Sequence, residues 1–345
     1  MQRISRPFKV LLILVVSICS DYANASSSPT VHNGVLDLRN WNSQINPQIS
    51  LEGEWKFYWD QHIEPSTYNG NLRSQASTAP VPGRWSELVA PGAGNQKLPS
   101  HGKATYTLDI AINPNTPKNL SISLSKIGTS YKLFALSSSQ SMLIGDMGRP
   151  GDSEPTSIAK MQNRTVSLPP LSQGNITLLI QVSNFVGPDG GMMGTPTLGL
   201  TQHVEASRDR KSIGLFLCLG ALLMLCLSQV LSLVSHPKSR VHRALTCLTF
   251  FALVFLALRG NLFHLLDPTG ETFSFQRLHR LEFILLSAML PCLALLYRPH
   301  LIRDGREKTL LASFVFTGTS GLFALLQNIH GVINALPYLS ILLSL

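Results

Sequence analysis

Between residues 26 and 205, this 345-residue chain contains no cysteine, so no disulfide can stabilise that region. The region also lacks an excess of charge, because its 12 basic side chains are balanced by 12 acidic ones. Without a basic patch it offers nothing that would hold nucleic acid, and we exclude that class of partner. A region of about 180 residues is nevertheless large enough to fold around its own core.

Catalytic motifs are absent as well, since the chain contains no G-x-S-x-G, P-loop or H-E-x-x-H pattern. The acidic residues between 26 and 205 are scattered, whereas glycoside hydrolysis needs two carboxylates about one scissile bond. Histidines occur at positions 242, 264, 279, 300 and 330, and they could suggest a metal or haem site. We favour the alternative that they lie at the membrane interface. We therefore predict that the protein is not an enzyme and that it holds no cofactor and no metal.

The first 25 residues have the pattern of a secretory signal peptide. Arg3, Arg6 and Lys9 precede an apolar core at residues 10–20, and Ala23-Asn24-Ala25 provides a small-x-small cleavage site. We expect cleavage after Ala25. The alternative is an uncleaved signal that remains as a first membrane helix, which leaves the following topology unchanged.

Residues 26–205 have a period-two pattern that is typical of half-buried strands. Leu108, Ile110 and Ile112 alternate with polar neighbours, residues 120–124 alternate as strictly, and residues 176–182 form a more apolar run. Frequent Pro and Gly separate these runs, and no long amphipathic helix interrupts them. The pattern predicts an antiparallel β-sandwich or jelly roll.

Two aromatic positions raise the possibility of a ligand-stacking surface. Trp55, Phe57, Tyr58 and Trp59 could form a sugar platform, but alternate side chains of one strand share a face, so we favour the core. Trp85 follows a Pro-Gly pair in loop-like sequence and is the better ligand candidate.

Four segments of this region carry short motifs in a fixed order. They are Leu51–Trp59, Val81–Trp85, Gly102–Leu108, and Gln181–Phe185 with Gly190-Gly191. In the same order they match L-x-G-x-W-x-F-Y-W, V-P-x-x-W, G-x-A-T-Y-x-L and I-x-V-S-N-F followed by G-G. Together they resemble the exported domain of bacterial seven-transmembrane receptors with diverse intracellular signalling modules, the DISM receptors.

The resemblance implies a jelly roll that binds a small ligand such as a carbohydrate. Trp85, Tyr106, Asn184 and Asp189 lie in or beside the matched segments and are our ligand-binding candidates. The resemblance also implies that full-length relatives continue through seven helices into an output module, such as a cyclase, kinase or phosphatase.

Downstream of residue 211 the chain becomes strongly apolar, and five blocks qualify as candidate membrane spans. The last block has 15 residues and runs to the end of the chain, so we expect a truncated member of the family or one that signals through a separate cytoplasmic partner. The predicted spans are 212–234, 244–266, 281–297, 309–329 and 331–345.

The signal peptide and the exported region set the topology, with the sandwich in the periplasm and the helices in the bacterial inner membrane. The expected cytoplasmic loops, 235–243 and 298–308, carry seven basic residues. Five basic residues remain on the outer side, so the charge bias is modest. They are Arg208, Arg210, Lys211, Arg277 and Arg280.

Arg259 is the one charge well inside a predicted span, and such a charge is a functional-site hypothesis by default. Its side chain could simply extend to the outer interface. Alternatively it pairs with Glu282 and couples the second and third helices.

Two functions follow from these observations. The preferred hypothesis is a membrane sensor whose periplasmic sandwich binds a small ligand and relays the event through the helix bundle. The alternative is a structural or adhesive envelope module, anchored in the membrane, that transduces no signal.

Overall fold

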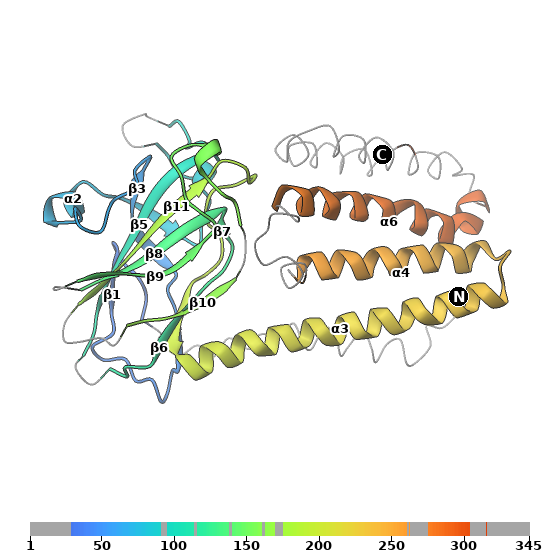
Figure 1. Cartoon of the computed structure of the whole chain (residues 1–345), viewed down its shortest axis with the longest axis horizontal. Helices are drawn as coiled ribbons and strands as arrows, with labels where there is room; N and C mark the ends of the chain where they lie inside the picture. The colour runs from blue at the N-terminus through green and yellow to red at the C-terminus, as the bar shows by residue number, and fades with distance from the viewer. Residues whose placement is uncertain are drawn as a thin grey trace.

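The computed structural model of the chain describes residues 29–90, 95–113, 116–137, 140–160, 163–169, 175–260, 262, 275–303 and 315. The predicted signal peptide and, apart from Val315, the predicted spans 309–329 and 331–345 lie outside these residues. Within them, β-sheets stacked as a sandwich are followed by three long helices (Figure 1). This arrangement confirms the all-β region and the helical region, while five spans and jelly-roll connectivity stay predictions.

The larger sheet has seven strands, and neighbours along its main path are antiparallel. The short β1 (Val35–Asp37) adds one parallel pairing to β5. β11 pairs along its whole length with β5 on one side and for most of its length with β8 on the other, so it forms the centre. In spatial order the path is β4 (Ser77–Val81), β3 (Gly53–Trp59), β5 (Gly102–Ala111), β11 (Ile176–Asn184), β8 (Ser130–Leu136) and β9 (Ser141–Met147).

A smaller antiparallel sheet faces the larger one. A two-stranded ribbon, β7 (Ile127–Gly128) with β12 (Gly191–Met192), lies beside them. The strands of the smaller sheet are, in spatial order, β10 (Arg164–Ser167), β6 (Leu120–Leu124), β13 (Thr197–Leu200) and β2 (Gln48–Ser50).

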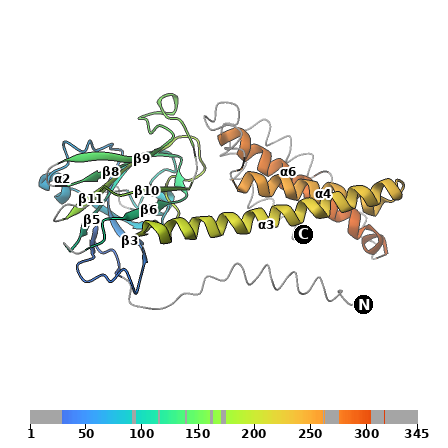
Figure 2. The ribbon, with the colours of Figure 1, turned by 60° about the horizontal axis from the view of Figure 1, so that its bottom comes forward.

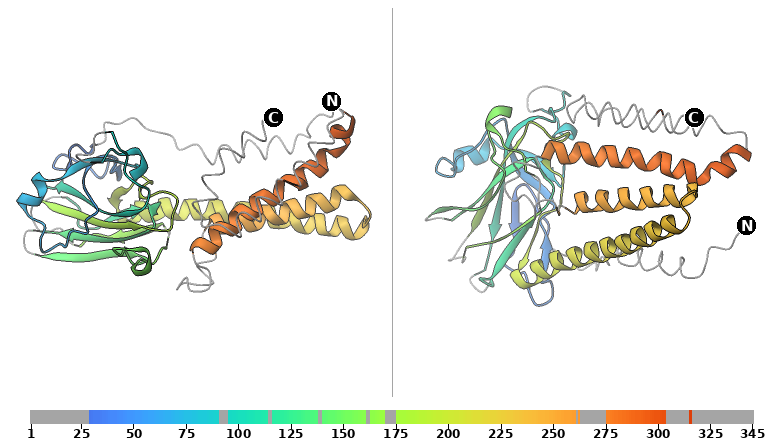
Figure 3. Two further views of the ribbon diagram at one scale, coloured as in Figure 1. Left: turned by 90° about the horizontal axis from the view of Figure 1, so that it is seen from above. Right: turned by 45° about the vertical axis from the view of Figure 1, so that its right-hand side comes forward.

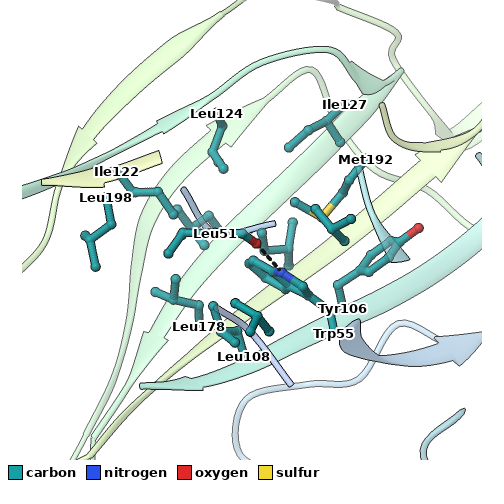
Figure 4. Close-up of a cluster of buried hydrophobic side chains, with 14 of the residues drawn as sticks. Leu51, Trp55, Tyr106, Leu108, Ile122, Leu124, Ile127, Leu178, Met192 and Leu198 are labelled. Atoms are coloured by element: carbon teal, nitrogen blue, oxygen red, sulfur yellow. Dashed lines mark hydrogen bonds between the residues drawn. The ribbon is translucent and has the colours of Figure 1, made fainter. Parts of the chain in front are cut away.

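The main core lies between the two sheets, and period-two alternation explains which side chains enter it. Leu108 and Leu178 of the larger sheet point toward Ile122 and Leu198 of the smaller one (Figure 4). Trp55 is fully buried among them and donates its indole N–H to the carbonyl of Leu51 at 2.8 Å. The aromatic run of β3 is therefore core, as the sequence favoured.

The opposite face of the larger sheet is covered by the connection between β3 and β4, residues 60–76, which we call the cover segment. It contains the short α2 (Gly70–Ser74), whose first amides are capped by the side chain of Asn69. Ile63 of this segment packs against Tyr58 and Leu179 in a second small core. All nine residues of β11 are consequently buried, because both faces of the sheet are covered.

The three described helices run side by side, with α4 (Arg240–Arg259) between α3 (Thr201–Ser235) and α6 (Phe275–Arg303) (Figures 1 and 3). Each is long and apolar enough to cross a membrane. α3 begins at Thr201, upstream of the predicted span 212–234, because good helix formers continue through its polar first turns. α4 ends at Arg259 and is capped by Gly260, and most of the remainder of the predicted span 244–266 lies outside the described residues.

α3 leaves the sandwich without a linker, since β13 ends at Leu200 and the helix begins at Thr201 (Figure 2). The Thr201 amide and hydroxyl both donate to the carbonyl of Asn119, at 3.0 Å each. Within the first two turns Val204 is buried, and Ser207 donates to the side chain of Gln48 at 3.1 Å. The first turns of α3 are thereby fastened to the smaller sheet.

Candidate functional site

The four ligand candidates from the sequence lie close to one another. Asp189 and Trp85 are linked through their neighbours, because the Trp85 amide donates to the carbonyl of Gly190 at 3.0 Å. A side chain at Gly190 would collide with the Trp85 ring, since a Cβ would lie 2.1 Å from Cε3. Tyr106 contacts the same tryptophan, so the turn before β12 and the segment after β4 form one packed unit.

Trp85 is part of the core and not of a ligand-stacking surface. It lies in a short 3-10 helix, Trp85–Glu87, is fully buried, and packs edge-on against Trp59 with ring centroids 5.0 Å apart. Its indole N–H donates to the hydroxyl of Tyr106 at 2.8 Å. The loop interpretation failed because the Pro-Gly sequence that suggested exposure instead turns the chain inward, over the end of the sandwich.

The side chain of Asn184 is also part of the packed structure, because backbone groups occupy its amide. It is fully buried, donates to the carbonyls of Ser100 and Gly187, and accepts the Gly187 amide at 2.8 Å. Asp189 is partly exposed and lies 3.6 Å from the guanidinium of Arg84. Of the four candidates, Asp189 with its partner Arg84 is therefore the one that faces solvent.

A second polar cluster joins four segments that are distant in the sequence. The imidazole of His62, in the cover segment, lies 3.1 Å through Nε2 from the hydroxyl of Ser183, at the end of β11. Its Nδ1 lies 3.7 Å from the carboxylate of Asp152, which also receives the ammonium of Lys103 at 2.7 Å. We call these four residues the His62 cluster.

The electrostatics of the His62 cluster favour a neutral imidazole. Burial lowers the pKa of His62, and the nearby Lys103 ammonium lowers it further, while the Val182 carbonyl and the Asp152 carboxylate oppose the shift. The Lys103 ammonium in turn lowers the pKa of the Asp152 carboxyl. The cluster thus holds an ion pair next to an uncharged histidine.

Serine, histidine and aspartate in this order resemble a hydrolytic triad, but the geometry opposes nucleophilic attack. Ser183 is fully buried and donates its hydroxyl proton to the carbonyl of Gly151 at 2.7 Å rather than to the imidazole. A nucleophile needs a base that takes its proton and a path for substrate, and Ser183 has neither. The cluster instead fastens the cover segment and the 148–158 loop to the larger sheet.

A third group of polar residues holds the other end of the cover segment. Arg73 lies 3.2 Å from the Asp109 carboxylate, donates to Thr177 at 3.2 Å, and stacks over the ring of Tyr68. Thr177 also donates to Asp109 at 2.5 Å. The cover segment is therefore held by polar contacts at both ends and by a small apolar core between them.

In the helical region, the two intramembrane coupling candidates do meet. Nε of Arg259, the last residue of α4, lies 3.9 Å from Oε2 of Glu282 in α6. The Arg259 side chain is 63% exposed and that of Glu282 is 15% exposed, and His279 also approaches Glu282 at 3.1 Å. Arg259 is thus the last residue of α4, and the macrodipole favours a cation at that end of a helix.

Among the described residues, no group of three or more His, Cys, Asp or Glu side chains is placed to hold a metal ion. The rings of His242 and His236 stack on each other, and His279 faces Glu282. His264 and His330 lie outside the described residues.

Comparison with known proteins identifies no family. No family model and no curated protein matches the chain. Among solved structures, the chain is similar to a GH2 β-galacturonidase from Eisenbergiella tayi, with 15% identity and a TM-score of 0.29, over 44% of this chain and 24% of that one. It is also similar to a β-glucuronidase from Ruminococcus gnavus, with 10% identity and a TM-score of 0.30, over 44% and 29%. The chain spans less than a third of the length of either enzyme, and likeness at this level carries no argument about activity.

The buried Trp85–Tyr106 hydrogen bond gives a first prediction. We expect Tyr106→Phe to lower the free energy of unfolding of the sandwich by about 1–3 kcal/mol, because the Trp85 N–H loses its acceptor. Tryptophan fluorescence of the full chain in urea measures this, since all four tryptophans lie upstream of the helices. Tyr131→Phe is the matched control, because the buried Tyr131 hydroxyl has no hydrogen-bond partner in the described part of the chain. Equal losses in both variants would contradict the assignment.

The His62 cluster predicts a pH dependence. Because the pKa of His62 in the folded protein lies below its ordinary value of 6.5, stability from this group is complete above that pH and falls as the pH drops below it. We expect His62→Gln to reduce this acid loss, measured as the change in the urea midpoint between pH values above and below 6.5. The exposed His32→Gln serves as control, and an unaltered pH profile in His62→Gln would rule the effect out.

The Arg259–Glu282 pair predicts non-additive stability of the bundle. Each of Arg259→Gln and Glu282→Gln should lower the free energy of unfolding by at most about 1 kcal/mol, because the guanidinium is largely exposed. The double variant should cost less than the two single changes together. Helical circular dichroism of the detergent-solubilised chain during heating measures all three, with Arg240→Gln at the other end of α4 as control. Strict additivity would show that the pair couples nothing.

Proposed function

We propose that this protein is a membrane-bound sensor, whose exported sandwich binds a small ligand such as a carbohydrate and whose helices relay the event. The observation that carries the proposal is the fixed junction between β13 and α3. A tether that only holds a domain at a membrane needs no such rigidity. A relay does need it, because a flexible linker would absorb any movement.

The contacts of α3 suggest how a movement is relayed. α3 packs on β6, β10 and β13, which all belong to the smaller sheet. The His62 cluster and the Arg84–Asp189 pair lie on strands and connections of the larger sheet. A ligand that favours one position of the larger sheet relative to the smaller one therefore changes the position of α3.

The motif resemblance to the DISM receptors supports the same function and a jelly-roll connectivity of the strands. It also supports a location in the bacterial inner membrane, with the sandwich in the periplasm. Output would require a cytoplasmic partner or module. The solvent-facing Arg84–Asp189 pair is the place we assign to initial ligand contact, since it offers both a cation and a carboxylate beside a packed aromatic core.

The chain itself supplies separate reporters for binding and relay. All its tryptophans lie in the sandwich, and the described cysteines lie in the helices, where Cys226 and Cys292 are buried and Cys218 and Cys247 are exposed. The full chain in nanodiscs is titrated with sugars, glycans and cell-wall fragments by calorimetry and tryptophan fluorescence. Labelling by a membrane-permeable maleimide then reports on the bundle.

We expect at least one compound to give heat, a fluorescence change and an altered labelling rate at Cys226 or Cys292. Insertion of a Gly-Ser linker between Leu200 and Thr201 should preserve binding and abolish the labelling change, because the junction becomes flexible. Binding without any labelling change in the unaltered chain would refute the relay and favour the structural or adhesive module. Absence of heat across the whole panel would refute small-ligand binding.

A further inference from the structure

The sandwich-facing end of the helix bundle carries a group of basic side chains that the sensor function does not explain. Positive residues are normally retained on the cytoplasmic side, so five on the opposite side oppose the expected bias. They lie at the start of α3 and in the first turns of α6 (Figure 1).

Two contacts show that these helix ends lie at the same level. A side chain at Gly260, which caps α4, would collide with Leu215 of α3, since a Cβ would lie 2.3 Å from its Cδ2. Lys211 is four residues before Leu215 and so shares its face, one turn toward the sandwich. On the other side, Arg259 reaches Glu282, which places the first turns of α6 beside the end of α4.

Two described acidic residues at this level, Glu282 and Asp209, already have partners. Glu282 is approached by both Arg259 and His279, and Asp209 is paired with its neighbour Arg208 at 3.1 Å. Within the described part of the chain, neither of these two carboxylates pairs with Arg210, Lys211 or Arg280.

One cation in particular is incompletely satisfied. Nε of Arg280 is buried and has no hydrogen-bond partner among the described residues. Arg210 and Lys211 are exposed, immediately before the long apolar stretch that begins at Ser212. We call Arg210, Lys211 and Arg280 the outer basic group.

We propose that the outer basic group binds the phosphate of anionic phospholipid headgroups in the leaflet that faces the sandwich. The depth argues for lipid, because these cations stand where the polar turns of α3 give way to its apolar span, which is the level of the headgroups. The chemistry fits as well, since guanidinium and ammonium groups are the usual partners of phosphate oxygens. This surface is separate from the ligand contact assigned to the sandwich.

Native mass spectrometry of the detergent-solubilised full chain tests the proposal, with phosphatidylglycerol and phosphatidylcholine of matched acyl chains in equal amounts. We expect bound phosphatidylglycerol to exceed phosphatidylcholine. The variant Arg210→Gln, Lys211→Gln, Arg280→Gln should reduce this preference about tenfold. Raising the salt concentration should also weaken it, because screening shortens the reach of exposed charges.

Three further variants make the result decisive. Lys97→Gln with Lys118→Gln removes charge from the sandwich and should change nothing. Lys238→Gln, Arg240→Gln, Arg243→Gln removes charge from the other end of the bundle. It should leave the preference for phosphatidylglycerol intact, because the outer basic group supplies that preference. Arg210→Lys, Lys211→Arg, Arg280→Lys keeps the charge and should keep the preference.

Four outcomes would overturn the proposal. The first two are equal binding of both lipids by the unaltered chain, and loss of the preference only when the opposite end of the bundle is neutralised. The third is a loss of preference in the charge-retaining variant as large as in the neutralised one. The fourth is displacement of the lipid by inorganic phosphate at the headgroup concentration. The last result would mean that the group takes free phosphate rather than lipid.

Discussion

The fixed passage from β13 into α3 is the constraint on which the arrangement of the protein depends. A strand buried in the smaller sheet becomes a helix with no intervening residue, and the hydroxyls of Thr201 and Ser207 tie the first turns back to the sheet. The orientation of the sandwich relative to α3 is therefore determined by the smaller sheet. Any rotation of the smaller sheet therefore requires rotation of α3, and any rotation of α3 requires rotation of the smaller sheet.

The central strand of the larger sheet, β11, is buried on both faces. One face forms the main core with the smaller sheet, and the other lies under the cover segment. Several polar residues on the covered face are held in pairs and networks, as Arg73 with Asp109 and Lys103 with Asp152 illustrate. Such contacts are weaker and more dependent on pH and salt than the apolar core, so the cover segment is the part of the sandwich that solution conditions affect most.

Much of the fold follows from local patterns, whereas the polar clusters do not. Leu108 and Ile110 alternate with polar neighbours because one face of β5 enters the core, and that periodicity is visible in the chain. The charge-free run after Ser212 similarly predicts a helix, but not its true start, because Thr201 to Lys211 are helical without being apolar. Trp85 was misjudged because turn residues indicate a change of direction and not which side of the turn is buried.

The His62 cluster could not have been predicted from this sequence, since its members come from four segments and none of them lies in a recognisable motif. By contrast, Arg259 and Glu282 could be paired in advance, because a charge in an apolar segment has few possible partners. The difference lies in the surroundings. In water-exposed β-structure, many polar residues compete for each contact, and only the strand register decides among them. In the apolar helical segments, the scarcity of charges makes each one informative. The sequence therefore reveals polar contacts between the helices more readily than those within the sandwich.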